Sequence, residues 1–157
     1  MQIDVFGDVE AYGWRLRRVL MAAVRVAYEQ GFDREELDTS SIPNWFISIT
    51  DGGSHEEAIP VEVLAGRNAY YAARDQNEWD VQEWLFCFDP DLRYWHWWDL
   101  TSPGDRVAVL WIDTRGEWDV PCEELWWAVY AAGARSAEGL IWMSADEWRR
   151  QPSIGIT

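Results

Sequence analysis

One loop holds the side chains that could bind a metal ion. Asp51, His55, Glu56 and Glu57 lie close together in the sequence. Zinc sites use three or four Cys, His or carboxylate ligands. The chain has only two histidines and two cysteines, and His96 lies far from His55. We therefore expect this segment to be a solvated loop, and we expect neither a metal nor another cofactor.

Cys122 is the strongest candidate nucleophile. It lies at the expected start of a helix, where the positive end of the helix lowers the pKa of a thiol. Glu123 and Glu124 follow directly, and their negative charges disfavour a thiolate. Cys122 also falls on the expected inner stripe of that helix, which suits a buried structural cysteine. No Gly-x-Ser-x-Gly, P-loop or Gly-x-Gly-x-x-Gly motif occurs, so we predict that the protein is not an enzyme.

The tryptophans suggest binding more than catalysis. The chain has thirteen of them, and each is a large apolar group that must be packed or used. If residues 93–100 form a strand, Trp95 and Trp97 share one face and Trp98 lies on the other. One interpretation is a strand packed between two layers. The alternative is an exposed aromatic platform that stacks sugars or anchors a protein interface, where Trp, Tyr and Arg are enriched.

The net charge is the strongest functional signal. Twenty-eight acidic side chains face thirteen basic ones, all arginine, which gives a formal charge of -15 on 157 residues. The acids are concentrated in residues 29–62 and 75–99. A charged surface keeps a protein in solution, but a small domain needs far less charge for that, and the excess destabilises the fold through self-repulsion. A protein this acidic repels nucleic acid and anionic membranes and attracts basic surfaces.

These features predict an inhibitor of a basic protein. By size and composition the chain resembles the bacterial immunity proteins as a broad class, with no specific family motif. We expect an immunity protein or antitoxin that blocks a basic toxin domain, a nuclease or another effector that acts on nucleic acid. Electrostatic steering can raise association rates to roughly 10⁸–10⁹ M⁻¹s⁻¹. The alternatives are a DNA-mimic regulator of a nucleic-acid-binding protein and a small-molecule or sugar-binding domain built on the Trp-rich strands.

Two groups of side chains are predicted to bind the partner. The first surrounds an expected hairpin turn and consists of Asp89, Asp91, Asp99, Trp95 and Trp97. The second lies in acidic loops nearer the N-terminus and consists of Glu35, Glu36, Asp51, Glu56 and Glu57.

The sequence also predicts the compartment. Met1 to Glu10 has neither the positive nor the apolar region of a secretory signal, and no run of eighteen apolar residues would span a membrane. Cys87 and Cys122 form no Cys-x-x-Cys pair, so we expect reduced thiols. We therefore expect a cytoplasmic protein.

Residues 9–30 are predicted to form the longest helix, because apolar residues recur on one stripe at helical spacing. A second feature lies on the polar side, where Trp14, Met21 and Tyr28 repeat every seven residues. Either another element of the chain covers them, or they contact a partner or a second copy of the chain in a homodimer.

Other helices are predicted from start signals. Residues 61–74 are ambiguous: Pro60 suits the first position of a helix, whereas the alternation at 61–63 and Gly66 favour a strand. Residues 121–134 are predicted to form a second long helix. Ser144 to Glu147 is a capping box that begins a short final helix. A similar signature at Asp33 to Glu36 predicts a helical turn.

Five strands are predicted from alternation, β-branching and apolar runs. They cover residues 45–50, 84–89, 93–100, 107–113 and 140–143. The second and third would form a hairpin through a turn at Asp89 to Leu92, followed by a loop at residues 101–105, and the fourth would be a buried central strand.

Together these elements predict an α+β fold. The chain should be a single compact domain over residues 1–157, because 48% hydrophobic residues exclude a disordered acidic tail. A central, mainly antiparallel sheet of about four or five strands would be packed by two longer helices and short helical turns.

Overall fold

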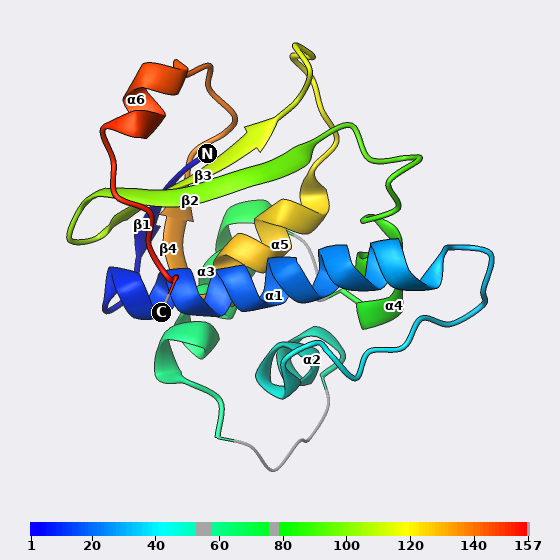
Figure 1. Cartoon of the computed structure of the whole chain (residues 1–157). Coiled ribbons are helices and arrows are strands. Elements are labelled where there is room, and N and C mark those ends of the chain that lie inside the picture. Colours follow the sequence, from blue (N-terminus) through cyan, green and yellow to red (C-terminus); the bar gives the residue numbers. More distant parts are fainter. Residues whose placement is uncertain (53–57, 76–78, 157) are drawn as a thin grey trace.

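The protein folds around an antiparallel sheet of four strands in the order β2-β3-β1-β4. The computed structural model describes residues 1–52, 58–75 and 79–156 (Figure 1). The strands of this described part are β1 (Gln2–Val5), β2 (His96–Gly104), β3 (Val107–Asp113) and β4 (Ala134–Ala137). Its helices are α1 (Val9–Gln30), α2 (Asn44–Thr50), α3 (Val61–Arg74), α4 (Val81–Phe86), α5 (Glu123–Ala131) and α6 (Ala145–Arg149). The predicted single α+β domain is confirmed.

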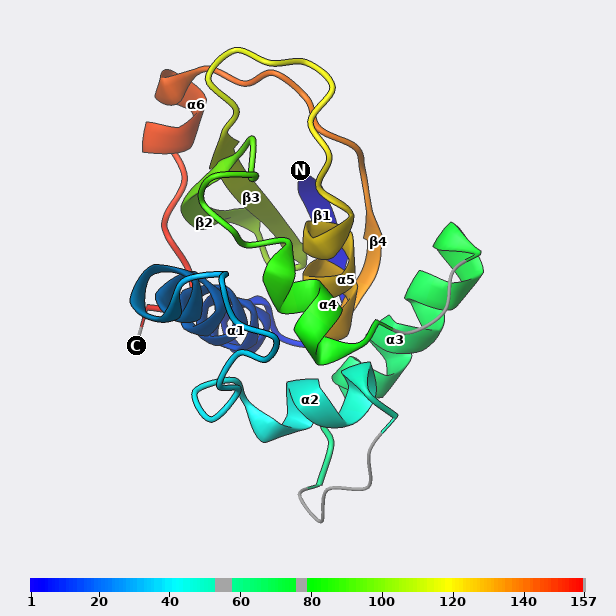
Figure 2. The ribbon, with the colours of Figure 1, turned by 90° about the vertical axis from the view of Figure 1, so that its right-hand side faces the viewer.

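The side chains of the inner strand β3 show which face of the sheet packs against the core. Its residues alternate between the faces, as in any strand. Ala108 and Leu110 belong to the main core cluster, whereas Val109 and Trp111 lie outside it although they too are buried. The core face is covered by α1, which contacts β2 and β3, and by α5. Figure 2 shows α6 on the other side of the sheet from α1 and α5.

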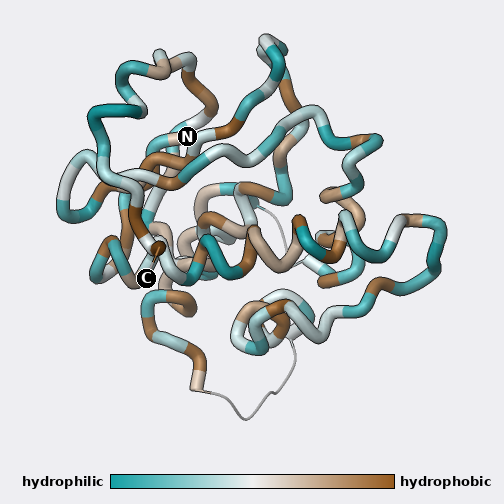
Figure 3. The backbone as a smooth tube through the Cα atoms, in the orientation of Figure 1, coloured by the Kyte–Doolittle hydropathy of each residue, from teal (hydrophilic) through white to brown (hydrophobic). Residues whose placement is uncertain are grey.

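The long helix α1 has the predicted bounds and the predicted apolar stripe. Its buried residues include Tyr12, Leu16 and Val19. Apolar and polar residues alternate in short blocks along it (Figure 3), which is the pattern of a helix with one buried face. Asp8 caps its start by accepting a hydrogen bond from the amide of Ala11 at 2.8 Å.

Three tryptophans are fully buried in the core, and each finds an acceptor for its indole N–H. Trp84 donates to the carbonyl oxygen of Glu124 at 3.0 Å. Trp95 donates to the carboxylate of Glu124 at 2.6 Å, and Trp127 to the hydroxyl of Thr50 at 3.0 Å. These bonds let large amphipathic side chains fill the interior without an unsatisfied donor.

Two predicted strands are helices. Residues 45–50 lie in α2, where Trp45, Phe46 and Ile49 are buried at helical spacing. Residues 84–86 lie in α4, which begins where the side chain of Asp80 accepts from two backbone amides. Short apolar runs of this kind fit either state, because their periodicity is too brief to decide.

The other strand predictions need smaller corrections. Residues 140–143 are not a strand, and β1 and β4 were missed because each is only four residues long. The strand predicted at 93–100 begins at His96 and continues through the predicted loop to Gly104, so its hairpin partner is β3. Asp89 to Leu92 does turn the chain, but between α4 and β2, and Asp33 to Glu36 is not helical.

The remaining predictions are confirmed. The structure has β3 at 107–113 and α3 at 61–74 with the predicted bounds. The helix predicted at 121–134 is present as α5 but is shorter, since it ends at Ala131 and Ala134 begins β4. The capping box of Ser144 and Glu147 lies at the start of α6 as predicted.

Candidate binding surface

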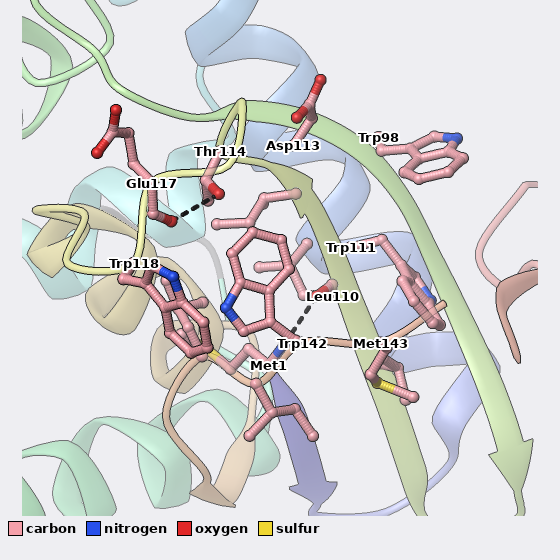
Figure 4. Close-up of a pocket in the computed structure, with 14 residues that line it drawn as sticks. Met1, Trp98, Leu110, Trp111, Asp113, Thr114, Glu117, Trp118, Trp142 and Met143 are labelled. Atoms are coloured by element: carbon pink, nitrogen blue, oxygen red, sulfur yellow. Dashed lines mark hydrogen bonds between the residues drawn. The ribbon is translucent and has the colours of Figure 1, made fainter. Parts of the chain in front are cut away.

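A cavity of about 200 Å³ opens on the face of the sheet turned away from α1. Figure 4 shows its lining side chains in front of β2 and β3, with helices behind the strands. Most of the lining is apolar, and four separate segments supply it: Met1, the strands β2 and β3, the loop after β3 and the chain before α6. The tryptophans among these residues are Trp98, Trp111, Trp118 and Trp142. We call this site the tryptophan pocket.

Each exposed tryptophan of the pocket packs against another indole, and Trp111 forms a buried floor. Trp118 and Trp142 meet edge to face with their centroids 5.1 Å apart, and Trp98 meets Trp148 of α6 at 4.7 Å. Trp111 is buried and donates its indole N–H to the hydroxyl of Thr101 at 2.7 Å. By contrast, Trp98, Trp118 and Trp142 are 49%, 79% and 54% exposed. Large apolar groups gathered at a surface mark an interaction site.

Two carboxylates lie at the rim of the pocket. Asp113 ends β3 and accepts a hydrogen bond from the backbone amide of Arg115 at 2.8 Å. Glu117 follows in a turn in which the hydroxyl of Thr114 donates to the carbonyl oxygen of Glu117 at 2.9 Å. In Figure 4 both carboxylates point toward the top of the view, above the indoles of Trp118 and Trp142.

No arginine or histidine lines the pocket among the described residues. Met1 lines it, and its α-amino group donates to the carbonyl oxygen of Leu110 at 3.0 Å. Burial lowers the pKa of this amine to about 6. Among the described lining residues, the charged side chains are therefore the carboxylates of Asp113 and Glu117.

Asp99 attaches the C-terminal segment to the sheet. Its carboxylate accepts hydrogen bonds from Arg17 of α1, from the indole of Trp148 at 2.8 Å and from the hydroxyl of Ser153 at 2.7 Å. Burial alone would raise the pKa of Asp99, but the hydrogen bonds from Ser153, Trp148 and Arg17 outweigh it and hold this pKa below its ordinary value. Asp99 thus fixes α6, and with α6 the ring of Trp148 beside Trp98.

Residues 151–154, the C-terminal strap, run along the outer edge of β2. Thr101 and Ser153 form an antiparallel bridge. The amide of Ser102 donates to the carbonyl oxygen of Pro152 at 3.0 Å, and that of Ile154 to Leu100 at 3.0 Å. The strap therefore extends the sheet by a short additional piece.

Replacing Ser144 by alanine should loosen the wall of the pocket. Ser144 follows the lining residue Met143, and its side chain accepts from the amide of Glu147 while Glu147 bonds back to Ser144. Loss of such a cap costs about 1 kcal/mol of local stability. We expect faster amide exchange in α6 with little change elsewhere. Ser136→Ala, at an exposed serine of β4, should leave α6 unchanged, and equal exchange in both variants would contradict this role.

Two of the predicted partner-binding residues are not available at the surface. Trp95 is fully buried and donates to Glu124, so it is a core residue. Asp99 is also buried, and its carboxylate is occupied by its bonds to α1 and to the C-terminal segment. Both corrections have one cause: this segment lies against α1 and α5, as in the interpretation of a strand packed between two layers and not in that of an exposed platform.

The other residues of the first predicted group differ in how accessible they are. Trp97 is half-buried against the core, with the guanidinium of Arg17 5.5 Å from its ring centre. Asp91 is exposed, and its amide donates to the carboxylate of Asp89 at 2.9 Å. The turn that holds Asp89 and Asp91 therefore remains a candidate surface.

The second predicted group lies partly around the start of α4. Glu35 and Glu36 are exposed in the loop after α1. The next residue, Leu37, accepts from and donates to the side-chain amide of Gln82. Asp51 accepts from the amide of Val81 at 2.7 Å. Glu56 and Glu57 lie outside the described residues.

Trp14, Met21 and Tyr28 are exposed on α1. The interpretation in which another element covers this side is therefore wrong for the described residues. The guanidinium of Arg18 lies over Trp14, 4.6 Å from the centre of the indole ring. A homodimer through this stripe stays a prediction.

The thiols are poor nucleophiles. Burial, together with the nearby carboxylate of Glu124, raises the pKa of both Cys87 and Cys122 to about 11. Within the described ranges, no three Cys, His, Asp or Glu side chains are grouped so that they could hold a metal ion.

Sequence reasoning missed Trp118 and Trp142, which form the most exposed pair of the pocket. One signal could have found Trp118: it lies between Glu117 and Asp119 after a Thr-Arg-Gly turn, a polar setting in which an indole has little to pack against. Nothing comparable marks Trp142.

Comparison of the chain with protein-family models, curated proteins and solved structures finds no match. Among the described helices, none is both long and apolar enough to cross a membrane.

Proposed function

We propose that this protein is a non-catalytic inhibitor that binds and blocks a basic toxin domain acting on nucleic acid, as a cytoplasmic immunity protein or antitoxin does. The observation that carries the proposal is the tryptophan pocket, with exposed indoles beside carboxylates, in a domain with a net charge of -15. Tryptophans that are half exposed and grouped are typical anchors of protein interfaces.

The acidic surface and the tryptophan pocket would act at different stages of binding. Acidic turns such as Asp89–Asp91 attract the basic partner over a distance and raise the association rate, because opposite potentials steer diffusion. Desolvation of the tryptophans would then hold the complex and slow its dissociation.

The test begins with capture of partners from the lysate of the source cell at low and then moderate salt. The captured basic protein is then purified, and its activity on nucleic acid is measured with increasing amounts of this chain. We expect stoichiometric inhibition that weakens when Trp118 and Trp142 are both replaced by alanine. A basic partner that binds but keeps its full activity would overturn the proposed inhibition.

Charge reversal at the acidic turn should slow association. Asp89→Arg combined with Asp91→Arg is expected to lower the association rate about tenfold at low salt and to flatten its salt dependence. Glu29→Arg with Asp105→Arg makes the same change in net charge at other exposed positions. Equal rates for the two double variants, measured by stopped flow, would remove the turn from the interface.

A small-molecule or sugar-binding domain is the second candidate, since a pocket lined by tryptophan is the feature that such a function requires. Saturable binding of methyl glucoside in the pocket would favour it over the inhibitor.

A further inference from the structure

We infer that the tryptophan pocket receives one arginine side chain of the basic partner. The inference rests on the proposed function and names the contact by which the partner is held.

The volume of the pocket suits a single side chain. Small-molecule sites usually span roughly 300–1,000 Å³, whereas this cavity has about 200 Å³. One long side chain lying across the pocket would fill it, with its apolar stem over the indoles and its charged end at the rim.

The chemistry of the walls favours a cation. Indole faces attract guanidinium groups through the ring quadrupole, and tryptophan does so best of the aromatic residues. Asp113 and Glu117 stand at the rim, where the planar fork of a guanidinium can bond to a carboxylate while it stacks on a ring. Among the described residues, no arginine or histidine side chain lines the pocket, so no basic side chain there competes for the two carboxylates.

The chain's own arginines show this contact elsewhere. Guanidinium groups lie 4.6 Å from the ring centre of Trp14, 4.8 Å from that of Trp95 and 4.4 Å from that of Trp126. Among the described residues, no arginine lies over Trp98, Trp118 or Trp142, which pair with other indoles instead. Among the exposed indoles of the described chain, these three are therefore the ones that have no arginine of their own and could take a cation from another molecule.

A titration of the whole chain with small probes tests the inference without the partner. The probe is N-acetyl-arginine methylamide, and its control is the citrulline analogue, which has nearly the same shape but no charge. Indole N–H signals are followed by NMR with ¹⁵N-labelled tryptophan. We expect saturable shifts at Trp98, Trp118 and Trp142, with a Kd on the order of 1 mM for so small a ligand. The citrulline analogue should bind at least tenfold more weakly.

Variants separate the pocket from the rest of the surface. Asp113→Asn with Glu117→Gln should weaken the arginine probe about tenfold or more, because the rim charges are lost while the shape is kept. Trp14→Leu changes an exposed indole on α1 and should leave the affinity unchanged. Thermal unfolding of each variant checks that the fold is intact.

Equal affinity for the two probes would overturn the cation site. So would saturable shifts with methyl glucoside but not with arginine, which would assign the pocket to sugars. Neither result would contradict inhibition of a basic toxin, which the activity assay with the purified partner tests separately. Conversely, a pocket that binds the arginine probe in a protein that inhibits no basic partner would overturn the proposed function alone.

Discussion

Replacing Glu124 by glutamine should stabilise the protein at pH 8 by up to about 3 kcal/mol and leave its stability almost unchanged at pH 4. Glu124 is buried in the first turn of α5. Burial raises the pKa of its carboxyl from 4.5 to about 7, although the hydrogen bond from Trp95 and the charge of Arg93 act in the opposite direction. A tenfold difference in proton affinity between the folded and unfolded protein corresponds to about 1.4 kcal/mol.

The sign follows from proton binding. Between pH 4.5 and 7 the folded protein holds a proton on Glu124 that the unfolded chain has already lost. Rising pH therefore removes stability across this window and has no further effect through Glu124 above it. Glutamine carries no charge to bury, and its carbonyl oxygen can still accept from the indole of Trp95.

Urea unfolding of both proteins at half-unit steps from pH 4 to 8 measures the effect. The difference between the curves isolates Glu124 from the many other carboxylates. Glu138→Gln, at an exposed position, serves as the control and should run parallel to the original protein. A curve for Glu124→Gln that is also parallel would show that Glu124 titrates normally.

Gly66→Ala should destabilise the fold by about 3 kcal/mol, the upper part of the usual range for overpacking. Gly66 is buried where α3 crosses α5. A Cβ atom there would collide with the carbonyl oxygen of Tyr130 and would lie 2.8 Å from Cα of Gly133. Both atoms belong to the backbone, so no side chain can rotate away, and the two helices would have to separate.

The matched control is Gly139→Ala. A Cβ atom at Gly139 would meet nothing within 4 Å, so the same change of residue should alter the free energy of unfolding by less than about 0.5 kcal/mol. Urea midpoints of the two variants give the comparison. Similar midpoints would mean that the helix crossing yields more easily than its geometry implies.

The predictability of each element followed its length and its burial pattern. Residues 9–30 supply six turns of consistent periodicity, and the helix was predicted with its correct bounds. Residues 45–50 supply fewer than two turns, rich in β-branched and aromatic residues, so local preference pointed to a strand. The tertiary burial of Trp45, Phe46 and Ile49 on one side decided for a helix.

The candidate site was less predictable because its parts are distant in the sequence. Acidity and aromatic content can be read from the composition, and the tryptophan pocket has both properties. Composition does not tell which of the tryptophans line the pocket. The pairing of β2 with β3 is irregular between Trp97 and Asp99, so the strict alternation assumed for residues 93–100 did not hold. Trp118 and Trp142 meet only after β3, the following loop and the C-terminal segment have folded together.

The C-terminal strap has a consequence for how this protein can meet others. An unpaired edge strand is a template to which a foreign strand can add. Here the strap takes up backbone groups of Leu100 and Ser102 at the outer edge of β2, and the opposite edge is the four-residue β4, beside α3 and α5. The sheet thus offers little to strand addition or edge-to-edge aggregation. Contacts of this sheet with another protein would therefore be made by side chains and not by backbone pairing.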